Sequence, residues 1–181
     1  MTGRQPERVE TERLVLRRPR PDDADEIFAC YASDPEVTRY LSFPRHTSLE
    51  NTRAFLALSD ADWSRWPAGP YLIERRDGGE LIGSTGLTFE SEQRAATGYL
   101  LAREAWGRGY ATEALRAIVD VARSAGVLRL HALCHCDHAA SVRVLEKAGF
   151  ACEGTLRRYV VFPNLSPGEP LDVLCYARVL G

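Results

Sequence analysis

The chain has 181 residues, of which 45% are hydrophobic and 27% are charged, a composition typical of a globular protein. Its formal net charge of -2 argues against a protein whose main task is to wrap nucleic acid. No apolar run approaches the roughly 18 residues of a membrane span, and the polar residues 1–10 contain no apolar signal core. We therefore expect a cytoplasmic protein, with residues 1–181 forming a single domain and with no nucleic-acid or membrane partner.

The first half of the chain predicts strands and helices that are interrupted by proline and glycine. Strands are expected where apolar and polar residues alternate, and helices where acidic or polar residues precede apolar ones. The predicted elements are, in chain order, a strand over 13–17, a helix over 22–32, a helix over 48–66, a hairpin with strands over 71–74 and from 81, and a strand over 95–101.

The second half contains the clearest helix, over 109–125, because its apolar residues fall on one face and its charged residues on the other. The strictly alternating segment 128–136 predicts a strand, and 137–149 predicts a further helix. Two strands over 151–162 and 171–180 close the chain. This order predicts a mixed α/β or α+β fold, with the strand–helix–strand unit of residues 95–136 at its centre.

A glycine-containing turn, residues 107–112 (Gly-Arg-Gly-Tyr-Ala-Thr), precedes that clearest helix. The start of a helix leaves backbone N–H groups unpaired and carries a partial positive charge, so small residues there allow an anion to approach closely. The spacing matches neither the phosphate loop of nucleotide hydrolases nor the dinucleotide-binding fingerprint. From the residues alone, two interpretations stay open: an anion site, or a tight turn that uses the backbone freedom of glycine.

Residues 106–115 (Trp-Gly-Arg-Gly-Tyr-Ala-Thr-Glu-Ala-Leu) resemble the cofactor motif of the GCN5-related N-acetyltransferases, the GNAT superfamily. They most resemble its Rim-type branch (RimJ/RimL-like), which is named for enzymes that acetylate the N-termini of ribosomal proteins. Gly109 and Ala111 fit the pattern Gln/Arg-x-x-Gly-x-Gly/Ala, whereas Trp106 stands at the Gln/Arg position. Residues 141–150 (Ser-Val-Arg-Val-Leu-Glu-Lys-Ala-Gly-Phe) resemble the second family signature, so the likeness spans nearly the whole chain.

This resemblance implies a splayed central mixed sheet of about six to seven strands, flanked by about four helices. It also implies that acetyl-CoA is the co-substrate, with its pantetheine arm between the strands of 95–101 and 128–136. A primary amine would attack the thioester directly in a ternary complex, with a peptide or protein N-terminal α-amine as the expected acceptor. The alternatives are a small amine or antibiotic as acceptor, a non-catalytic acyl-CoA-binding domain, and a structural protein that reuses the fold. A homodimer stays open.

The same resemblance implies which residues bind the cofactor. His138 stands where the family's Asn-x-x-Ser motif has its asparagine, and Ser141 matches the serine, close to the coenzyme sulfur. A hydroxyl there can give the departing thiolate a proton, although Ser141 is also a common first-turn helix residue. The expected cofactor-binding residues are Leu100, Leu101, Trp106, Gly107, Arg108, Gly109, Tyr110, Ala111, Thr112, His138 and Ser141.

The catalytic base is harder to assign. Many relatives carry a carboxylate just before a Gly-Tyr pair, but Gly98 and Tyr99 follow Ala95, Ala96 and Thr97, and we expect Tyr99 to be packing in the cleft. A water molecule is one alternative base. The candidate side chains are Glu90, Glu92, His131 and His135, of which we name Glu92 and His135, beside Ser141, as the expected catalytic residues.

The run Cys134-His135-Cys136, followed by His138, has the composition of a metal site. Strand alternation turns His135 to the opposite face, and same-face neighbours lie roughly 6.5 Å apart, too far for zinc ligands at about 2.0 to 2.3 Å. We therefore expect no metal. We expect the five cysteines to be free thiols, and no cysteine nucleophile, because no histidine shares the strand face of Cys134.

Overall fold

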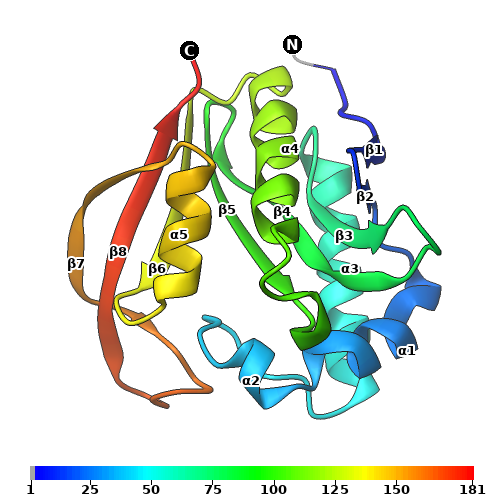
Figure 1. The fold of residues 1–181 in the computed structure, drawn as a ribbon, viewed down its shortest axis with the longest axis horizontal. Coiled ribbons are helices and arrows are strands. Elements are labelled where there is room, and N and C mark those ends of the chain that lie inside the picture. The colour runs from blue at the N-terminus through cyan, green and yellow to red at the C-terminus, as the bar shows by residue number, and fades with distance from the viewer. Residues whose placement is uncertain (1–2) are drawn as a thin grey trace.

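A computed structural model describes residues 3–181, and it contains one eight-stranded sheet with helices on both faces (Figure 1). The strand order is β1-β2-β3-β4-β5-β6-β8-β7, and every neighbouring pair is antiparallel except β5 and β6. The elements are β1 (Arg8–Glu10), β2 (Leu14–Arg17), α1 (Ala24–Ile27), α2 (Pro35–Thr38), α3 (Leu49–Arg65), β3 (Pro70–Arg75), β4 (Leu81–Ser91), β5 (Arg94–Leu101), α4 (Tyr110–Ser124), β6 (Arg129–His135), α5 (Ala139–Lys147), β7 (Ala151–Val161) and β8 (Pro170–Val179).

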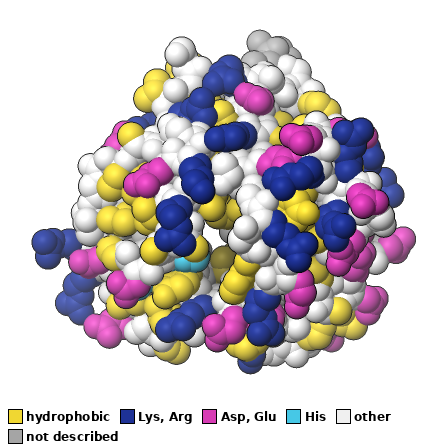
Figure 2. Space-filling model, viewed as in Figure 1, with side chains coloured by type: hydrophobic (Ala, Val, Ile, Leu, Met, Phe, Trp, Pro, Cys, Tyr) yellow, Lys and Arg dark blue, Asp and Glu magenta, His cyan; other side chains and the backbone are white. Residues whose placement is uncertain are grey.

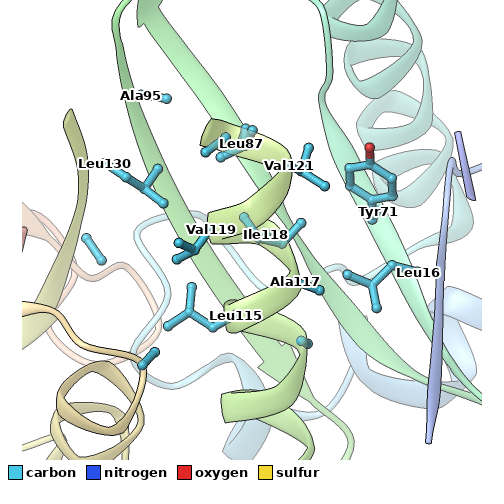
Figure 3. Close-up of a cluster of buried hydrophobic side chains, with 14 of the residues drawn as sticks. Leu16, Tyr71, Leu87, Ala95, Leu115, Ala117, Ile118, Val119, Val121 and Leu130 are labelled. Atoms are coloured by element: carbon cyan, nitrogen blue, oxygen red, sulfur yellow. The ribbon is translucent and has the colours of Figure 1, made fainter. Parts of the chain in front are cut away.

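Helix α4 connects the parallel strands β5 and β6 and packs on one face of the sheet (Figure 3). Its apolar residues recur every three to four positions, so one side of the helix is buried throughout. These side chains pack with Leu16, Leu87 and Leu130 from three different strands. The buried residues of α4 are Ala114, Leu115, Ala117, Ile118, Val119, Val121 and Ala122.

Helices α1 and α3 cover the other face (Figure 1). Leu72 of β3 packs with Ile27 and Leu56 from these helices, whereas its neighbour Tyr71 packs in the α4 core. Alternate residues of a strand point to opposite faces, so β3 belongs to both cores. None of the helices within residues 3–181 has the length and apolar character needed to cross a membrane.

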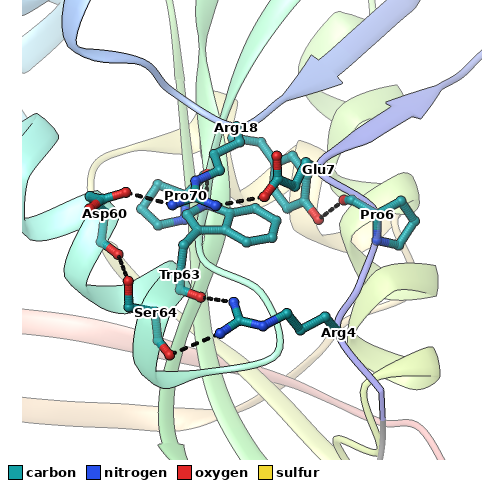
Figure 4. Close-up of polar contacts among 9 residues, drawn as sticks. Arg4, Pro6, Glu7, Arg18, Asp60, Trp63, Ser64 and Pro70 are labelled. Carbon is teal, nitrogen blue, oxygen red and sulfur yellow. Dashed lines mark hydrogen bonds and ion pairs between the residues drawn. The ribbon is translucent and has the colours of Figure 1, made fainter.

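The N-terminal segment is fixed to α3 by arginine side chains (Figure 4). Arg18 pairs with Glu7 at 2.6 Å and with Asp60 of α3 at 2.5 Å, while its guanidinium lies 5.4 Å from the Trp63 ring. Arg4 donates to the backbone carbonyl of Trp63. These contacts hold residues 4–7 beside the C-terminal half of α3.

The predicted elements are confirmed to within about two residues at most boundaries, but the predicted numbers of strands and helices were too low. Residues 3–181 contain eight strands and five α-helices. The additional strand β1 has three residues, of which only Val9 is apolar, so no alternation reveals it. The additional helix α2 has four residues and begins because the Asp34 carboxylate accepts hydrogen bonds from two amides of the first turn. The predicted helix over 22–32 is a 3₁₀ turn, α1 and a π turn in succession.

Arg17 lies at the end of β2 between two carboxylates. It donates two hydrogen bonds of 2.8 Å to Asp23 and one of 2.5 Å to Glu74. The three side chains are only 11% to 16% exposed. Burial alone would raise the pKa of Asp23, but the hydrogen bonds from Arg17 and the Arg20 amide hold it below its ordinary value, so the carboxylate stays charged.

Replacing Arg17 with methionine should lower the free energy of unfolding by about 3 kcal/mol, because two mostly buried carboxylates lose their cation. The matched control Arg18→Met should cost about 1 kcal/mol or less, since the partners Glu7 and Asp60 are exposed. Denaturant unfolding at pH 7 compares the variants, and equal losses would contradict the prediction. Because folding lowers the pKa of Asp23, its stabilisation is complete above the ordinary value of 3.8 and is lost as the pH falls through the lowered value.

Candidate active site

The sheet opens between β5 and β6, as the family resemblance implied. The two strands pair only at their beginnings, where Arg94, Ala95 and Ala96 lie beside residues 129–131. Farther along, β5 stays paired with β4 and β6 stays paired with β8, while β5 and β6 move apart (Figure 1). The backbone of residues 97–101 therefore faces an opening instead of a neighbouring strand, so an extended ligand can lie beside it.

Helix α4 begins at the wide end of this opening. Gly107 and Gly109 have φ values of 72° and 81°, in the left-handed region that favours glycine. A Cβ atom built on Gly107 would meet nothing within 4 Å, so the space above it is free. Within residues 3–181, no protein acceptor pairs with the backbone N–H groups of residues 107–112. Free N–H groups at the positive end of a helix form a site for an anion.

Contacts with the start of β2 fix the beginning of α4. Arg13 donates to the carbonyl of Arg108 at 2.9 Å, and its guanidinium lies 4.7 Å from the Tyr110 ring. Glu113 accepts hydrogen bonds from the Thr11 hydroxyl at 2.6 Å and from the amide and side chain of Arg13 at 2.8 and 2.7 Å. Burial alone would raise the pKa of Glu113, but these hydrogen bonds lower it, so Glu113 stays charged. The turn is therefore held in place by the rest of the fold.

The other predicted cofactor residues lie around the same opening. The Trp106 indole is half exposed and donates to the carbonyl of Leu101 at 2.7 Å, which joins the turn to the end of β5. The side chain of Leu101 is buried in the core, and that of Leu100 is partly buried. Ala111 and Thr112 lie in the first turn of α4. The role of each residue in cofactor binding stays a prediction.

A hydrogen bond between Tyr99 and Ser141 bridges the opening from β5 to α5. The two hydroxyl oxygens are 2.8 Å apart, and either can be the donor; the Ser141 carbonyl oxygen lies 3.1 Å from the Tyr99 hydroxyl, whose single proton can go to either acceptor. Burial raises the pKa of Tyr99, so this hydroxyl keeps its proton. Burial also raises the pKa of the neighbouring Cys134 thiol, which argues against a thiolate nucleophile there. The predicted packing role of Tyr99 leaves out this polar contact, which joins residues 42 positions apart.

Aromatic rings gather at the ends of β6 and β7. The Tyr40 ring stacks on His138 with 4.6 Å between centroids and lies 5.1 Å from His135, which Phe162 meets edge-on at 5.1 Å. The Nδ1 atom of His135 accepts a hydrogen bond from the Asp137 amide at 3.1 Å. Neutral His135 therefore carries its proton on Nε2 and has no free lone pair. It can donate a hydrogen bond from Nε2, while the Asp137 amide engages the lone pair of Nδ1.

One asparagine joins the two loops that border this aromatic cluster. The Asn164 side chain, in the loop between β7 and β8, donates to the carbonyls of Thr38 and Phe43 at 2.8 and 3.0 Å. Its oxygen accepts a hydrogen bond from the Arg45 amide at 2.8 Å. Residues 38–45 and the β7–β8 loop thus form one connected wall beside the opening. No sequence motif indicates this contact, because its partners are more than 100 residues apart.

The structure does not bring Glu92 to this site. Glu92 lies in the turn that precedes β5, and the five strand steps from Arg94 to Tyr99 alone span about 17 Å. Glu90 and His131 lie at the same distant end, where Glu90 pairs with Arg94 and is 3.4 Å from His131. The proton relay expected of Glu92 stays a prediction, and the structure places Glu92 at the opposite end of β5 from Tyr99, the partner of Ser141.

Figure 2 shows this face of the molecule hollowed near its centre, with hydrophobic atoms in the depth and basic side chains around the rim. The hollow lies between α5 and the turn before α4, when compared with Figure 1. Among residues 3–181, no three histidine, cysteine or acidic side chains gather in an arrangement that could hold a metal ion. All five cysteines are free thiols; Cys134 is buried and Cys136 is exposed beyond the end of β6.

The amino-acid sequence was compared with protein families and with known proteins. The sequence model of the Acetyltransferase (GNAT) domain matches residues 13–151. The uncharacterized N-acetyltransferase YoaA of Bacillus subtilis is 37% identical over 174 residues, which cover 94% of this chain and 96% of that protein. The uncharacterized N-acetyltransferase p20 of Bacillus licheniformis is 32% identical over 174 residues, which cover 94% of this chain and 95% of that protein.

The fold also matches a solved structure of RimL, a ribosomal L7/L12 alpha-N-protein acetyltransferase, in complex with coenzyme A. The TM-score is 0.83 over 96% of this chain and 98% of that chain, with 24% sequence identity, which shows the likeness of fold alone. The domain match and the two relatives, by contrast, establish the family. The chain belongs to the GNAT acetyltransferases and is an acetyl-CoA-dependent acetyltransferase.

Proposed function

We propose that this acetyltransferase moves the acetyl group from acetyl-CoA to the α-amino group of a peptide or protein. The observation that carries the proposal is the opening between β5 and β6, which ends at the free N–H groups of residues 107–112. A pyrophosphate fits these N–H groups, and a pantetheine arm fits the unpaired edge of β5. When bound, acetyl-CoA supplies the activated thioester.

In this proposal Ser141 assists the sulfur that leaves the thioester. Its hydroxyl is held by Tyr99, whose own hydroxyl keeps its proton because burial raises its pKa. Ser141 can therefore give a proton to the leaving thiolate while its oxygen stays hydrogen-bonded to Tyr99. Burial raises the pKa of the Cys134 thiol, which favours direct attack of the amine on the thioester within a ternary complex.

The acceptor reaches the site from the side of the aromatic cluster. The wall connected by Asn164 borders that side, and Tyr40 and Phe162 line it with apolar rings. With Glu90 and Glu92 at the distant end of β5, an acceptor amine of low pKa is favoured. An α-amino group has a pKa near 7.7 to 8.0, whereas a lysine side chain has one near 10.4. RimL, which shares the fold, is described as an alpha-N-protein acetyltransferase.

Gly107→Val should raise the Kd for acetyl-CoA at least tenfold, a loss of about 1.4 kcal/mol, because the side chain would occupy the space over the free N–H groups. Gly78→Val is the matched control, since Gly78 also has a positive φ of 88° and no neighbour within 4 Å. Calorimetric titration of both folded variants measures the effect. Equal affinities in the two variants would contradict the placement of the pyrophosphate.

Peptides with a free N-terminus should be acetylated with a kcat/KM at least tenfold above that of N-terminally blocked peptides with a free lysine. At pH 7, roughly a tenth of the α-amino groups are neutral, against only a few in ten thousand lysine side chains. Thiol release measured with matched peptide pairs gives the ratio. A clear preference for lysine would show that the acceptor class is assigned incorrectly.

A further inference from the structure

Acetyl transfer to an α-amino group requires a group that takes a proton from the acceptor. This inference rests on the proposed function and concerns the proton acceptor at the same site. The sequence suggests Glu92 and His135 for this role. Glu92 lies at the distant end of β5, and the lone pair of His135 is engaged by the Asp137 amide. The other imidazole that lies against Tyr40 belongs to His138, and its surroundings differ from those of His135.

His138 is the N-cap residue of α5 and stands three positions before Ser141, which lies in the first turn of that helix. Its ring is partly buried and is oriented by stacking on Tyr40. Within residues 3–181, neither ring nitrogen has a hydrogen-bond partner from the protein. His138 therefore has an oriented ring three positions before the proposed proton donor, with both nitrogens available to a ligand.

The surroundings of His138 favour a neutral ring. Burial, and then the neighbouring His135, lower the pKa of His138 below its ordinary value of 6.5. The loop that follows α2 contributes Tyr40, which stacks on His138, and Arg39. The Arg39 guanidinium lies 5.5 Å from the Tyr40 ring. On β6, the Sγ atom of Cys134 lies 3.8 Å from the His138 carbonyl, and this thiol is neutral. At pH 7 the imidazole thus has a lone pair ready to accept a proton.

We propose that His138 is the general base that deprotonates the acceptor amine. An N–H bond of the acceptor ammonium breaks, and the proton passes to the imidazole of His138, which later releases it to water. The freed electron pair forms the bond from nitrogen to the acetyl carbon, while the bond from that carbon to sulfur breaks. Ser141 gives its proton to the sulfur. The second proton that the nitrogen loses then restores the Ser141 hydroxyl, so the protons balance.

The test compares His138→Asn with His131→Asn at saturating acetyl-CoA, with an N-terminal peptide as acceptor, from pH 6.5 to 8.5. His131 lies at the distant end of the sheet, so its replacement should change kcat/KM less than twofold. His138→Asn should reduce kcat/KM at least tenfold at pH 6.5. The loss should shrink as the pH rises, because the amine loses its proton to solvent near its pKa of 7.7 to 8.0. His138→Gln, which retains more side-chain volume, should behave in the same way.

A loss that is the same at every pH would mean that His138 only orders the site, and it would overturn the assignment. No loss at any pH would overturn it as well. If the unmodified protein transfers acetyl groups to no amine in a broad panel, the proposed function itself fails, and that result is separate from any effect of the variants.

Discussion

The separation of β5 from β6 is the feature on which the rest of the site depends. A parallel pair normally continues along both strands, but here it stops after Ala96 and His131. The strands stay paired with β4 and β8, so the sheet keeps its stability on both sides of the opening. Backbone groups that the partner strand would have satisfied become available to a ligand. The fold thus supplies a binding edge without a long flexible loop.

Several contacts prepare the opening before any ligand arrives. Arg13 and Glu113 fix the start of α4 against β2, and Tyr99 joins β5 to α5 through Ser141. Asn164 connects the two loops on the acceptor side. Because these groups are already ordered, little conformational entropy is lost when the substrates bind. The same ordering holds Ser141 through Tyr99 and holds His138 through Tyr40.

The sequence predicted the parts of the fold whose periodicity is long and regular. The apolar face of α4 and the alternation of β6 are examples. It did not predict β1 or α2, which are too short to show a period, or the Tyr99–Ser141 contact, which depends on tertiary structure. The order of the chain already separates Glu92, which precedes β5, from the glycine turn, which follows β5.

A crystal structure of the protein with coenzyme A tests the central claim most directly. The account predicts that pyrophosphate oxygens accept hydrogen bonds from the N–H groups of residues 107–112. It also predicts that the pantetheine arm lies along residues 97–101 of β5, with the sulfur beside Ser141. Coenzyme A bound away from the start of α4, or an opening between β5 and β6 that stays empty at saturating ligand, would contradict the account.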